Sequence, residues 1–489
     1  MQLLRGVPSE RRGDVVAVLV LAVTCVALYG ATLCRTVYWY DSAEFAAHAA
    51  ALGVPHPPGY PLYTLIAHLF TWLPGEPALG VNVMSLTFGV IAVLLGYGLA
   101  RAIGCAPWSA AGAALLLATA RTFWGNAIVA EVYTPGLTFC MVVWLLLWRA
   151  EQTGSRRTEA LAAFVAGLAV GVHMSITTLG LGYAWLVWTR PEPGEAGGAR
   201  RRRLARSGVA AASTVAGLLV FLYIPLRTFE RWNRAEWIRF YKNATGGTFR
   251  RKFHGVDPIE RSEQMFGIFA DNLHVVGLAL AVIGFAWLLR RDRRWGVALL
   301  LGVVGNVGLF FTYHVPDLDV FVLPGMALCA IAAGQGMEAL AIGLRRLHPR
   351  AVWALLALAA IPAVHVAANY ADLDLSKRDE AARYAADVCD SIDRPAVMVT
   401  YSAPEEWRHY AVFLYVQNAF GQCKDVEVWT KPSDDRVRAL LRHPRRKAYA
   451  FLPLERLQAF ADLAPEGVLW RISPKDAARS AERSPGTPS

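Results

Sequence analysis

The fold is decided first by an apolar run near the N-terminus, residues 15–34, which reads VVAVLVLAVTCVALYGATLC and contains no charged residue. A run of this length crosses a hydrocarbon core of about 30 Å as a helix. Arg5, Arg11 and Arg12 precede it, as in a secretory signal, but the run is longer than a cleaved apolar segment and no small-residue cleavage site follows it. We therefore predict an uncleaved first membrane-spanning helix.

Comparable apolar runs recur over the first three quarters of the 489-residue chain. Only 18% of the residues are charged and the mean hydropathy is +0.34, which excludes a soluble or disordered chain. The net charge of +11 lies mostly in short basic clusters between apolar runs, which indicates membrane topology rather than a nucleic-acid partner. We predict about 11 spans, near residues 15–34, 81–103, 107–123, 134–149, 159–173, 174–189, 207–226, 272–290, 295–312, 320–343 and 351–369.

The basic clusters predict the orientation of the chain. Those at 149–157, 200–206, 290–294 and 345–350 all fall on the side of the N-terminus, which the positive-inside rule makes cytoplasmic. An odd number of spans then places the C-terminal tail outside. The Ala, Arg and Gly content suggests a bacterial source, so we expect a protein of the bacterial inner membrane whose active site and tail are periplasmic.

The chain is predicted to form an all-α polytopic membrane bundle with a small extracytoplasmic α/β C-terminal domain. The bundle takes residues 1–370, the α/β domain residues 371–475, and a disordered tail residues 476–489. A helical pattern at 376–392 and strand-like runs at 395–401 and 448–454 support the α/β prediction. Two cysteines of this region, Cys389 and Cys423, either form a disulfide or stay reduced, depending on the compartment.

An acidic motif follows the first span directly, in residues 39–45, which read WYDSAEF. On a helix, Asp41, Glu44 and His48 share one face. Two carboxylates and an imidazole at a membrane surface are suited to general-base chemistry or metal binding. The alternative is an interfacial helix whose acids only cap it and meet water.

The next motif is dense in proline: residues 54–63 read VPHPPGYPLY. Four prolines and a glycine within seven residues impose a stiff extended path that no membrane-spanning helix adopts. We predict that this segment positions His56, Tyr60 and Tyr63, and that Pro61 begins a short surface helix. The alternative is a simple turn.

Glu131 and Tyr133 lie at the edge of another span, where a carboxylate needs a partner such as Arg121 or a substrate hydroxyl. A structural ion pair is the alternative for Glu131. His173, at the end of the fifth predicted span, has the pattern of a satisfied interfacial histidine.

Basic and aromatic residues alternate after the seventh predicted span. Guanidinium forks match phosphate oxygens, and tryptophan and tyrosine favour the headgroup level, so this pattern predicts a site for a lipid-borne phosphate. Arg227 is the first candidate because it ends the span, and Arg231 and Arg234 follow. Plain binding to anionic headgroups is the alternative. The segment contains Arg227, Arg231, Trp232, Arg234, Trp237, Arg239, Tyr241 and Lys242.

Taken together, these motifs resemble a family of multi-span proteins that includes the animal transmembrane protein O-mannosyltransferase. The resemblance runs from about residue 14 to 390, and the proline motif is its most specific part. Ala43 replaces the glycine of many relatives, and the tail is shorter and different, which leaves the acceptor open. The motifs are DSAEF (41–45), LGVPHPPGYPLY (52–63), FW (123–124) with AEVY (130–133), YIPLR (223–227), and NY (369–370) with DEAARY (379–384).

The resemblance implies a class C glycosyltransferase that uses a sugar carried on a polyprenyl phosphate. In such enzymes an acid of the first outward loop is the base, and Asp41 occupies that position. We expect inverting transfer of a hexose, with mannose as first choice, to a hydroxyl of a protein or glycolipid. Glu44 and His56 would orient Asp41 or contact the sugar, with Tyr60, Tyr63, Glu131 and Tyr133 as further substrate contacts and Arg227, Arg231 and Arg234 on the phosphate.

Other functions predict other features. No Gly-rich phosphate loop is present, which disfavours a nucleotide-sugar donor. No cofactor and no nucleic acid are expected. A metal is not required, although Asp41, Glu44 and His48 are able to bind one. A transporter or flippase of an anionic lipid-linked substrate would use the carboxylates as a proton relay and should show charges in mid-membrane and inverted repeats. A purely structural partner of another enzyme would leave Asp41 replaceable.

Overall fold

The computed structural model describes residues 8–191, 199–348, 350, 355, 357–401, 403–442 and 445–475. The chain folds into two compact units. The helical unit comprises Met1–Leu33, Val54–Ile66 and Asn82–Ser376, and the α/β unit comprises Cys34–Gly53, Ala67–Val81 and Lys377–Ser489. The predicted disordered tail, 476–489, lies outside the described residues.

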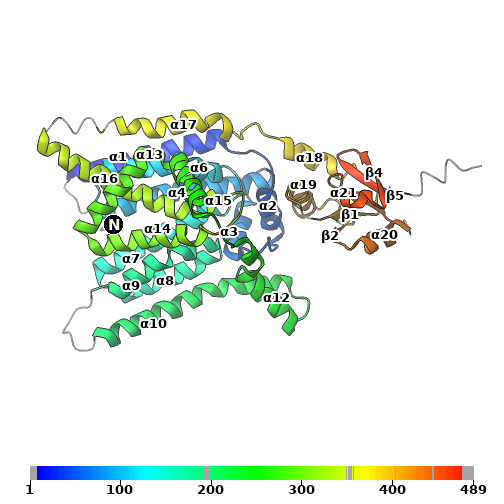
Figure 1. Cartoon of the computed structure of the whole chain (residues 1–489), viewed down its shortest axis with the longest axis horizontal. Helices are drawn as coiled ribbons and strands as arrows, with labels where there is room; N and C mark the ends of the chain where they lie inside the picture. The colour runs from blue at the N-terminus through cyan, green and yellow to red at the C-terminus, as the bar shows by residue number, and fades with distance from the viewer. Residues whose placement is uncertain are drawn as a thin grey trace, which may run out of the picture. The chain divides into compact units, whose positions relative to one another are not determined.

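The helical unit is a bundle of long apolar helices, whose colours run from blue to yellow in Figure 1. This confirms a membrane bundle, whereas the count of about 11 spans stays a prediction. Two further apolar helices, α3 (Pro61–Phe70) and α5 (Pro107–Ala118), are shorter. Among the described residues, seven helices are long and apolar enough to cross a membrane: Arg11–Thr32, Pro77–Ala102, Tyr133–Thr153, Arg200–Thr228, Pro258–Arg291, Arg293–Phe310 and Leu323–Leu347.

The helices that matter below include most of these spans and the shorter helices α8 and α9. Arg156–Val170 and Gly180–Thr189 are helices as predicted for the fifth and sixth spans, and residues 351–354 and 356 of the last predicted span are not described. The helices are α1 (Pro8–Thr32), α4 (Pro77–Ala102), α7 (Tyr133–Thr153), α8 (Arg156–Val170), α9 (Gly180–Thr189), α10 (Ala199–Leu218), α13 (Pro258–Arg291), α14 (Arg293–Phe310) and α16 (Leu323–Leu347).

Basic connections gather at one end of the helical unit. Arg294, in the first turn of α14, forms an ion pair with Glu151 near the end of α7, and its Nε donates a hydrogen bond to Thr189 at 3.0 Å. Arg291 donates to the backbone oxygen of Gly104 at 3.0 Å. The connections after four different helices therefore meet, and we call this the basic end. The short helices α11 (Tyr223–Thr228) and α12 (Arg234–Ala244) follow the far end of α10 (Figure 1).

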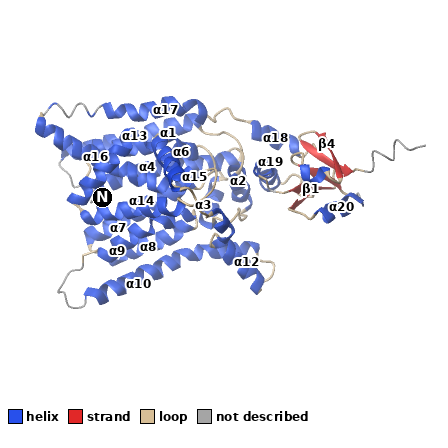
Figure 2. Ribbon diagram, viewed as in Figure 1, coloured by secondary structure: helices blue, strands red, loops and turns tan. Residues whose placement is uncertain are grey.

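The α/β unit is built on a five-stranded sheet of order β2-β1-β3-β5-β4, drawn in red in Figure 2. β1 pairs in parallel with β2 and β3, and β5 pairs antiparallel with β3 and β4. The predicted small α/β fold is thus confirmed, and Cys389 and Cys423 form a disulfide within it. The strands are β1 (Ala396–Thr400), β2 (Glu427–Thr430), β3 (Lys447–Ala450), β4 (Ala461–Glu466) and β5 (Leu469–Pro474).

Helices cover both faces of this sheet. Because successive side chains of a strand point to opposite faces, Met398 of β1 packs toward α18 (Glu380–Val388) and α19 (Pro404–Tyr415), whereas Val397 packs toward α20 (Asp434–Arg442). The Met398 face also buries Ala43 and Ala47 of α2 (Asp41–Ala51). The first loop after α1 therefore contributes a helix to the core of the α/β unit.

This packing groups two segments of the predicted bundle, residues 1–370, with the α/β unit. The sequence placed residues 34–53 and 67–81 with the membrane part, because they come between its first two spans. In the structure both segments pack in the α/β unit. The reason is the alanine-rich face of α2, which is narrow enough to lie directly on α19.

Candidate active site

Asp41 is the first residue of α2, as the acidic motif predicted. Tyr40 adopts a positive φ of 58° and its carbonyl accepts the backbone N–H groups of Ala43 and Glu44 at 3.1 and 3.4 Å, which starts the helix. The half-buried Asp41 carboxylate accepts a hydrogen bond from the indole Nε1 of Trp407, at 2.8 Å from its Oδ1. An N–H donor to a carboxylate favours its charged form and limits its rotation.

Glu44 and His48 occupy the same face of α2, one and two turns further on. Glu44 is 3% exposed, and its Oε1 lies 3.8 Å from His48 Nε2. This confirms the shared face predicted for Asp41, Glu44 and His48. The negative charge of Glu44 also reaches Tyr410: burial first, and then this charge, raise the pKa of the Tyr410 phenol.

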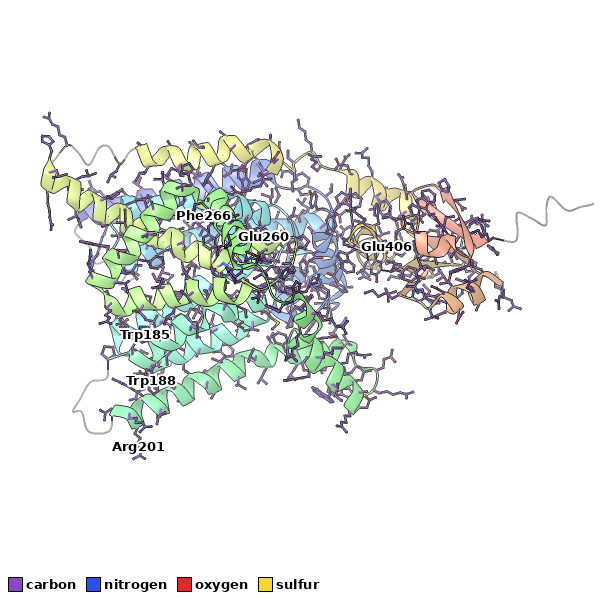
Figure 3. All side chains as sticks on the ribbon, in the orientation of Figure 1. Trp185, Trp188, Arg201, Glu260, Phe266 and Glu406 are labelled. Carbon is purple, nitrogen blue, oxygen red and sulfur yellow. A yellow bond between two sulfur atoms is a disulfide. The ribbon has the colours of Figure 1, made fainter. Side chains whose placement is uncertain are left out.

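The first turn of α19 explains why Trp407 is well placed. The buried Glu406 carboxylate, labelled in Figure 3, accepts the backbone N–H groups of Tyr401 and Ala403, each at 3.1 Å. These bonds hold the start of the helix, and Trp407 follows directly. Sequence reasoning missed Trp407, because it lies 366 residues from Asp41 and no local pattern marks it.

Within the α/β unit, Trp39 of the loop after α1 also packs against residues of α18 and α19. The guanidinium of Arg408 lies 4.2 Å from the ring centroid of Trp39, a cation–π geometry. The rings of His409 and Tyr384 lie 5.5 and 5.8 Å from Trp39. Burial is the main cause that lowers the pKa of His409. The residues on both sides of Asp41 are thus anchored by packing.

The proline motif, in the helical unit, forms an aromatic cluster. The hydroxyl of Tyr60 lies 3.0 Å from His56 Nε2, and the Tyr60 ring stacks on His173 with a centroid distance of 5.9 Å. Tyr133 approaches the same imidazole, at 4.9 Å between centroids. The structure therefore brings together three predicted site residues, and His173, predicted only as an interfacial histidine, is at their centre.

Tyr63 and Glu131 lie close to this cluster. Backbone N–H groups of Leu62 and Tyr63 donate to the carbonyl of Gly171 at 2.9 and 3.4 Å, which docks the start of α3. Tyr63 is 1% exposed and close enough to Glu131 to feel its charge. The short helix predicted after Pro61 is confirmed as α3. The guanidinium of Arg121, one suggested partner of Glu131, donates instead to Asn369 and Asp372, at 2.9 and 3.1 Å.

A cavity of about 280 Å³ separates the proline motif from the segment after α10. Pro57, Pro58 and Gly59 line one side, and Ile224 and Arg239 line the other. Gly59 has a φ of +97°, and a Cβ on it would lie 2.7 Å from Ile224 Cδ1, so only glycine allows this approach. Two segments far apart in the sequence thus meet as walls of one cavity.

The predicted phosphate-binding arginines are placed as follows. Arg227 lies beside the Tyr223 hydroxyl at the end of α11, and Arg227, Arg231 and Arg234 are all exposed. Among the described residues that line the cavity, Arg239 is the arginine, in place of these three. It belongs to the same basic and aromatic segment, but its spacing does not distinguish it from its neighbours. Arg239 also pairs with Glu236, one turn earlier on α12.

The fold is that of the class C glycosyltransferases: a membrane bundle together with an α/β unit that takes most of its residues from the C-terminal part of the chain. The crystal structure of ArnT from Cupriavidus metallidurans bound to undecaprenyl phosphate matches with a TM-score of 0.61, covering 93% of this chain and 97% of that chain at 13% sequence identity. The fold class predicted from the motifs is confirmed. The chain is an integral membrane protein.

Comparison of sequences points to particular relatives. The family model of the Protein O-mannosyl-transferase TMEM260 N-terminal domain matches residues 41–195. Protein O-mannosyl-transferase TMEM260 of Mus musculus is 28% identical over 434 residues, which are 81% of this chain and 60% of the mouse protein. The undecaprenyl phosphate-alpha-4-amino-4-deoxy-L-arabinose arabinosyl transferase of Pseudomonas aeruginosa is 33% identical over 278 residues, 54% of this chain and 46% of the relative.

These matches confirm the resemblance inferred from the motifs. The chain is similar to the TMEM260 O-mannosyl-transferases and, in its fold, to ArnT. It spans about three fifths of the mouse relative's length. The matched residues 41–195 include α2, the proline motif, Glu131 and Tyr133.

Proposed function

We propose that the protein is a class C glycosyltransferase that moves a sugar from a polyprenyl-phosphate donor to a hydroxyl of a protein or glycolipid. Mannose is the first choice of sugar, because the family match and the longest sequence similarity are to O-mannosyl-transferases. The second relative is named for a different sugar on undecaprenyl phosphate. The polyprenyl-phosphate carrier therefore has support from this relative and from the ArnT structure bound to undecaprenyl phosphate, and mannose has support from the O-mannosyl-transferases.

The cavity between the proline motif and α12 is the observation that carries the donor site. It brings an arginine, Arg239, to the wall opposite a rigid proline turn. Arg227, Arg231 and Arg234 lie in the same connection and are exposed. A planar guanidinium binds phosphate through two parallel hydrogen bonds, so these side chains suit the phosphate of a lipid-linked sugar.

The proposed base is Asp41. It accepts the proton of the acceptor hydroxyl while that oxygen bonds to the anomeric carbon from the side opposite the phosphate. The bond between the anomeric carbon and the phosphate oxygen breaks, and its electron pair leaves with the polyprenyl phosphate, whose added charge the arginines stabilise. General-base catalysis of this kind is typically worth about 10² to 10⁴ in rate.

The remaining predicted residues take positioning and binding roles in this proposal. Glu44, paired with His48 in the α2 core, supports the helix that carries Asp41. His56, Tyr60 and Tyr133 surround the His173 ring, and aromatic faces with polar edges are suited to a sugar. We also assign Tyr63 and Glu131 to the sugar. His56 follows the end of α2 after only four residues, 52–55, so the two motifs are neighbours in the chain.

The orientation is part of the proposal. We place the basic end of the helical unit in the cytoplasm and the α/β unit outside, in the periplasm of a bacterial inner membrane. The basic end supports this through the positive-inside rule. The Cys389–Cys423 disulfide supports it because such bonds persist in oxidising compartments, whereas the five cysteines of residues 25–329 are buried and form no disulfide.

The test is a transfer assay with the full chain in lipid nanodiscs. Radiolabelled undecaprenyl phosphate mannose and, in parallel, undecaprenyl phosphate 4-amino-4-deoxy-L-arabinose are supplied with a periplasmic and membrane extract as acceptor. Wild type is compared with Asp41→Asn, and Asp435→Asn, an exposed acid of α20, is the matched control.

Transfer by wild type and by Asp435→Asn, with a loss of about 10² to 10⁴ in Asp41→Asn, supports the enzyme and its base. The donor that is used identifies the sugar. Equal transfer by wild type and Asp41→Asn overturns the assignment of the base. Movement of either lipid across a vesicle membrane without any transfer would establish the transporter alternative.

A further inference from the structure

A second cavity, of about 580 Å³, lies among α7, α8, α9 and α10 of the helical unit. No residue assigned to the candidate site lines it. Its walls are almost entirely apolar, with Leu147, Val170 and several alanines among them, and its volume falls within the roughly 300–1,000 Å³ of small-molecule sites. Because α7 and α10 belong to membrane-crossing stretches, the apolar material that reaches this cavity is lipid hydrocarbon.

The wall formed by α10 leads from this cavity to the basic end. Ser207, Ala210, Ala211 and Thr214 line the cavity and recur at the spacing of one helical face. Arg203 precedes Ser207 by four residues and extends the same face by one turn. Its Nε is buried and has no hydrogen-bond partner among the residues that the structure describes.

A buried charged cluster lies beside the same end of the cavity. Glu159 of α8 forms an ion pair with Arg190, just after α9, and its Oε1 lies 3.2 Å from Nε of Arg206. All three residues are less than 9% exposed, and two guanidinium groups share this single carboxylate. Among the described residues, this cluster holds two guanidinium groups and one carboxylate, and α10 adds Arg203 and three further arginines without any acidic residue of its own.

Trp188 marks the rim of the cavity near these charges. It lines the cavity, is 43% exposed, and lies two residues before Arg190 (Figure 3). Tryptophan favours the boundary between hydrocarbon and headgroups. An apolar cavity, an interfacial tryptophan and an excess of arginine at one end together match an amphiphile with a hydrocarbon chain and an anionic head.

We propose that this cavity binds one anionic phospholipid of the leaflet at the basic end, with an acyl chain in the cavity among α7, α8, α9 and α10 and its phosphate at Arg203 and Arg206. Arginine is suited to this contact because its fork matches phosphate oxygens. Basic pockets between membrane helices on the cytoplasmic side bind such headgroups. The site is separate from the proposed donor cavity, whose arginine, Arg239, lies beyond the opposite end of α10.

The chain offers matched variants for a test. Arg203→Gln removes the charge on the cavity face, and Arg201→Gln removes an exposed charge from the same helix (Figure 3). Ala210→Phe fills the cavity, whereas Ala212→Phe adds the same ring at an exposed position of α10. The purified full chain in detergent is titrated with dioleoyl phosphatidylglycerol, dioleoyl phosphatidylcholine or undecaprenyl phosphate. Native mass spectrometry counts bound lipid and a thermal melt reports stabilisation.

We expect wild type to retain one phosphatidylglycerol in preference to phosphatidylcholine. Arg203→Gln should weaken this binding about fivefold, the factor that corresponds to ~1 kcal/mol per basic residue near an anionic surface, and Arg201→Gln should not. Ala210→Phe should abolish it while Ala212→Phe retains it. If Ala210→Phe does not fold, the arginine pair decides.

Three results would overturn the proposal. Equal retention of phosphatidylglycerol and phosphatidylcholine would mean unselective surrounding lipid. Equal binding by Arg203→Gln and Arg201→Gln would remove the headgroup site. Retention of undecaprenyl phosphate, lost in Ala210→Phe, in place of phosphatidylglycerol would assign the cavity to the isoprenoid chain instead.

Discussion

The helix that carries Asp41 and the helix that carries Arg239 are equal in length but are held in opposite ways. In α2, seven of 11 residues are buried, and the hydrogen-bond partner of Asp41 lies 366 residues away. In α12, also 11 residues long, none of the described residues is buried, and two local contacts hold its first turns: Asn233 caps the helix at Glu236, and Arg239 pairs with Glu236.

This difference follows the chemistry proposed for each helix. A base has to meet one proton at hydrogen-bond distance, so its carboxylate benefits from a fixed rotamer and a rigid helix. A phosphate carries its charge over several oxygens and attracts arginines over a longer range, so exposed side chains suffice until the ligand arrives. The proposed base is therefore held in place by folding, and we expect the ligand to order the arginines.

We expect the largest effect when the disulfide of the α/β unit, which contains α2, is removed. The double variant Cys389→Ala, Cys423→Ala opens a loop with a sequence separation of 34, which should cost about 3 kcal/mol of unfolding free energy. Chemical denaturation of the full chain measures the loss, and sugar transfer should fall with it because α2 shares this core. Wild type treated with reductant is the control and should reproduce the variant. Unchanged denaturation would contradict the comparison.

Arg227→Ala changes the exposed arginine segment after α10, and it should lower sugar transfer without lowering the stability of the protein. Removing a cation from the leaving phosphate should lower kcat/KM for the lipid donor about 100-fold, the low end of the range for groups that stabilise developing charge, because Arg227 is exposed. The melting temperature should not change. Arg251→Ala, an exposed arginine in the same outward segment, is the control. A fall in stability without loss of transfer would break the comparison.

Trp407→Phe tests the α2 helix more finely, because it removes the hydrogen bond from Trp407 to Asp41 and changes the side-chain volume only a little. The indole N–H stabilises the charged carboxylate of Asp41, and such a bond contributes ~1.5–3 kcal/mol, so we expect transfer to slow at least about tenfold. The acidic limb of the pH–rate profile should also move to higher pH. Trp429→Phe, on β2, controls for loss of an indole. Identical profiles for wild type and Trp407→Phe would show that the bond does not position the base.

The smallest effect is a pH dependence of the α/β unit. Burial lowers the pKa of His409 below its usual 6.5, so the unfolded chain binds its proton first as the pH falls. The stability from this residue is therefore complete above about pH 6.5 and declines below it. Melting temperatures between pH 5 and 8 should show this decline, and His409→Gln should flatten it. His254→Gln, an exposed histidine of the helical unit, should leave the decline in place.

Much of the site could be predicted from local patterns. The acidic helix, the proline turn and the helix after Pro61 were all expected, because helical spacing and proline geometry act over a few residues. Whether Cys389 and Cys423 form a disulfide could not be predicted, because the sequence contains no information on the distance between them. Arg239 was not selected over Arg227, Arg231 and Arg234, because which arginine faces a cavity depends on how α12 turns toward the proline motif.

Several membrane crossings, and an acid and a rigid proline turn after the first span, could be predicted from the order of the residues alone. Hydrophobic length and backbone restriction are local properties, so they can be read residue by residue. Only the tertiary structure decided that α2 belongs to the α/β core, that Trp407 holds Asp41, and that His173 lies among the site tyrosines. These depend on packing between segments hundreds of residues apart, and such packing leaves no pattern in either segment alone.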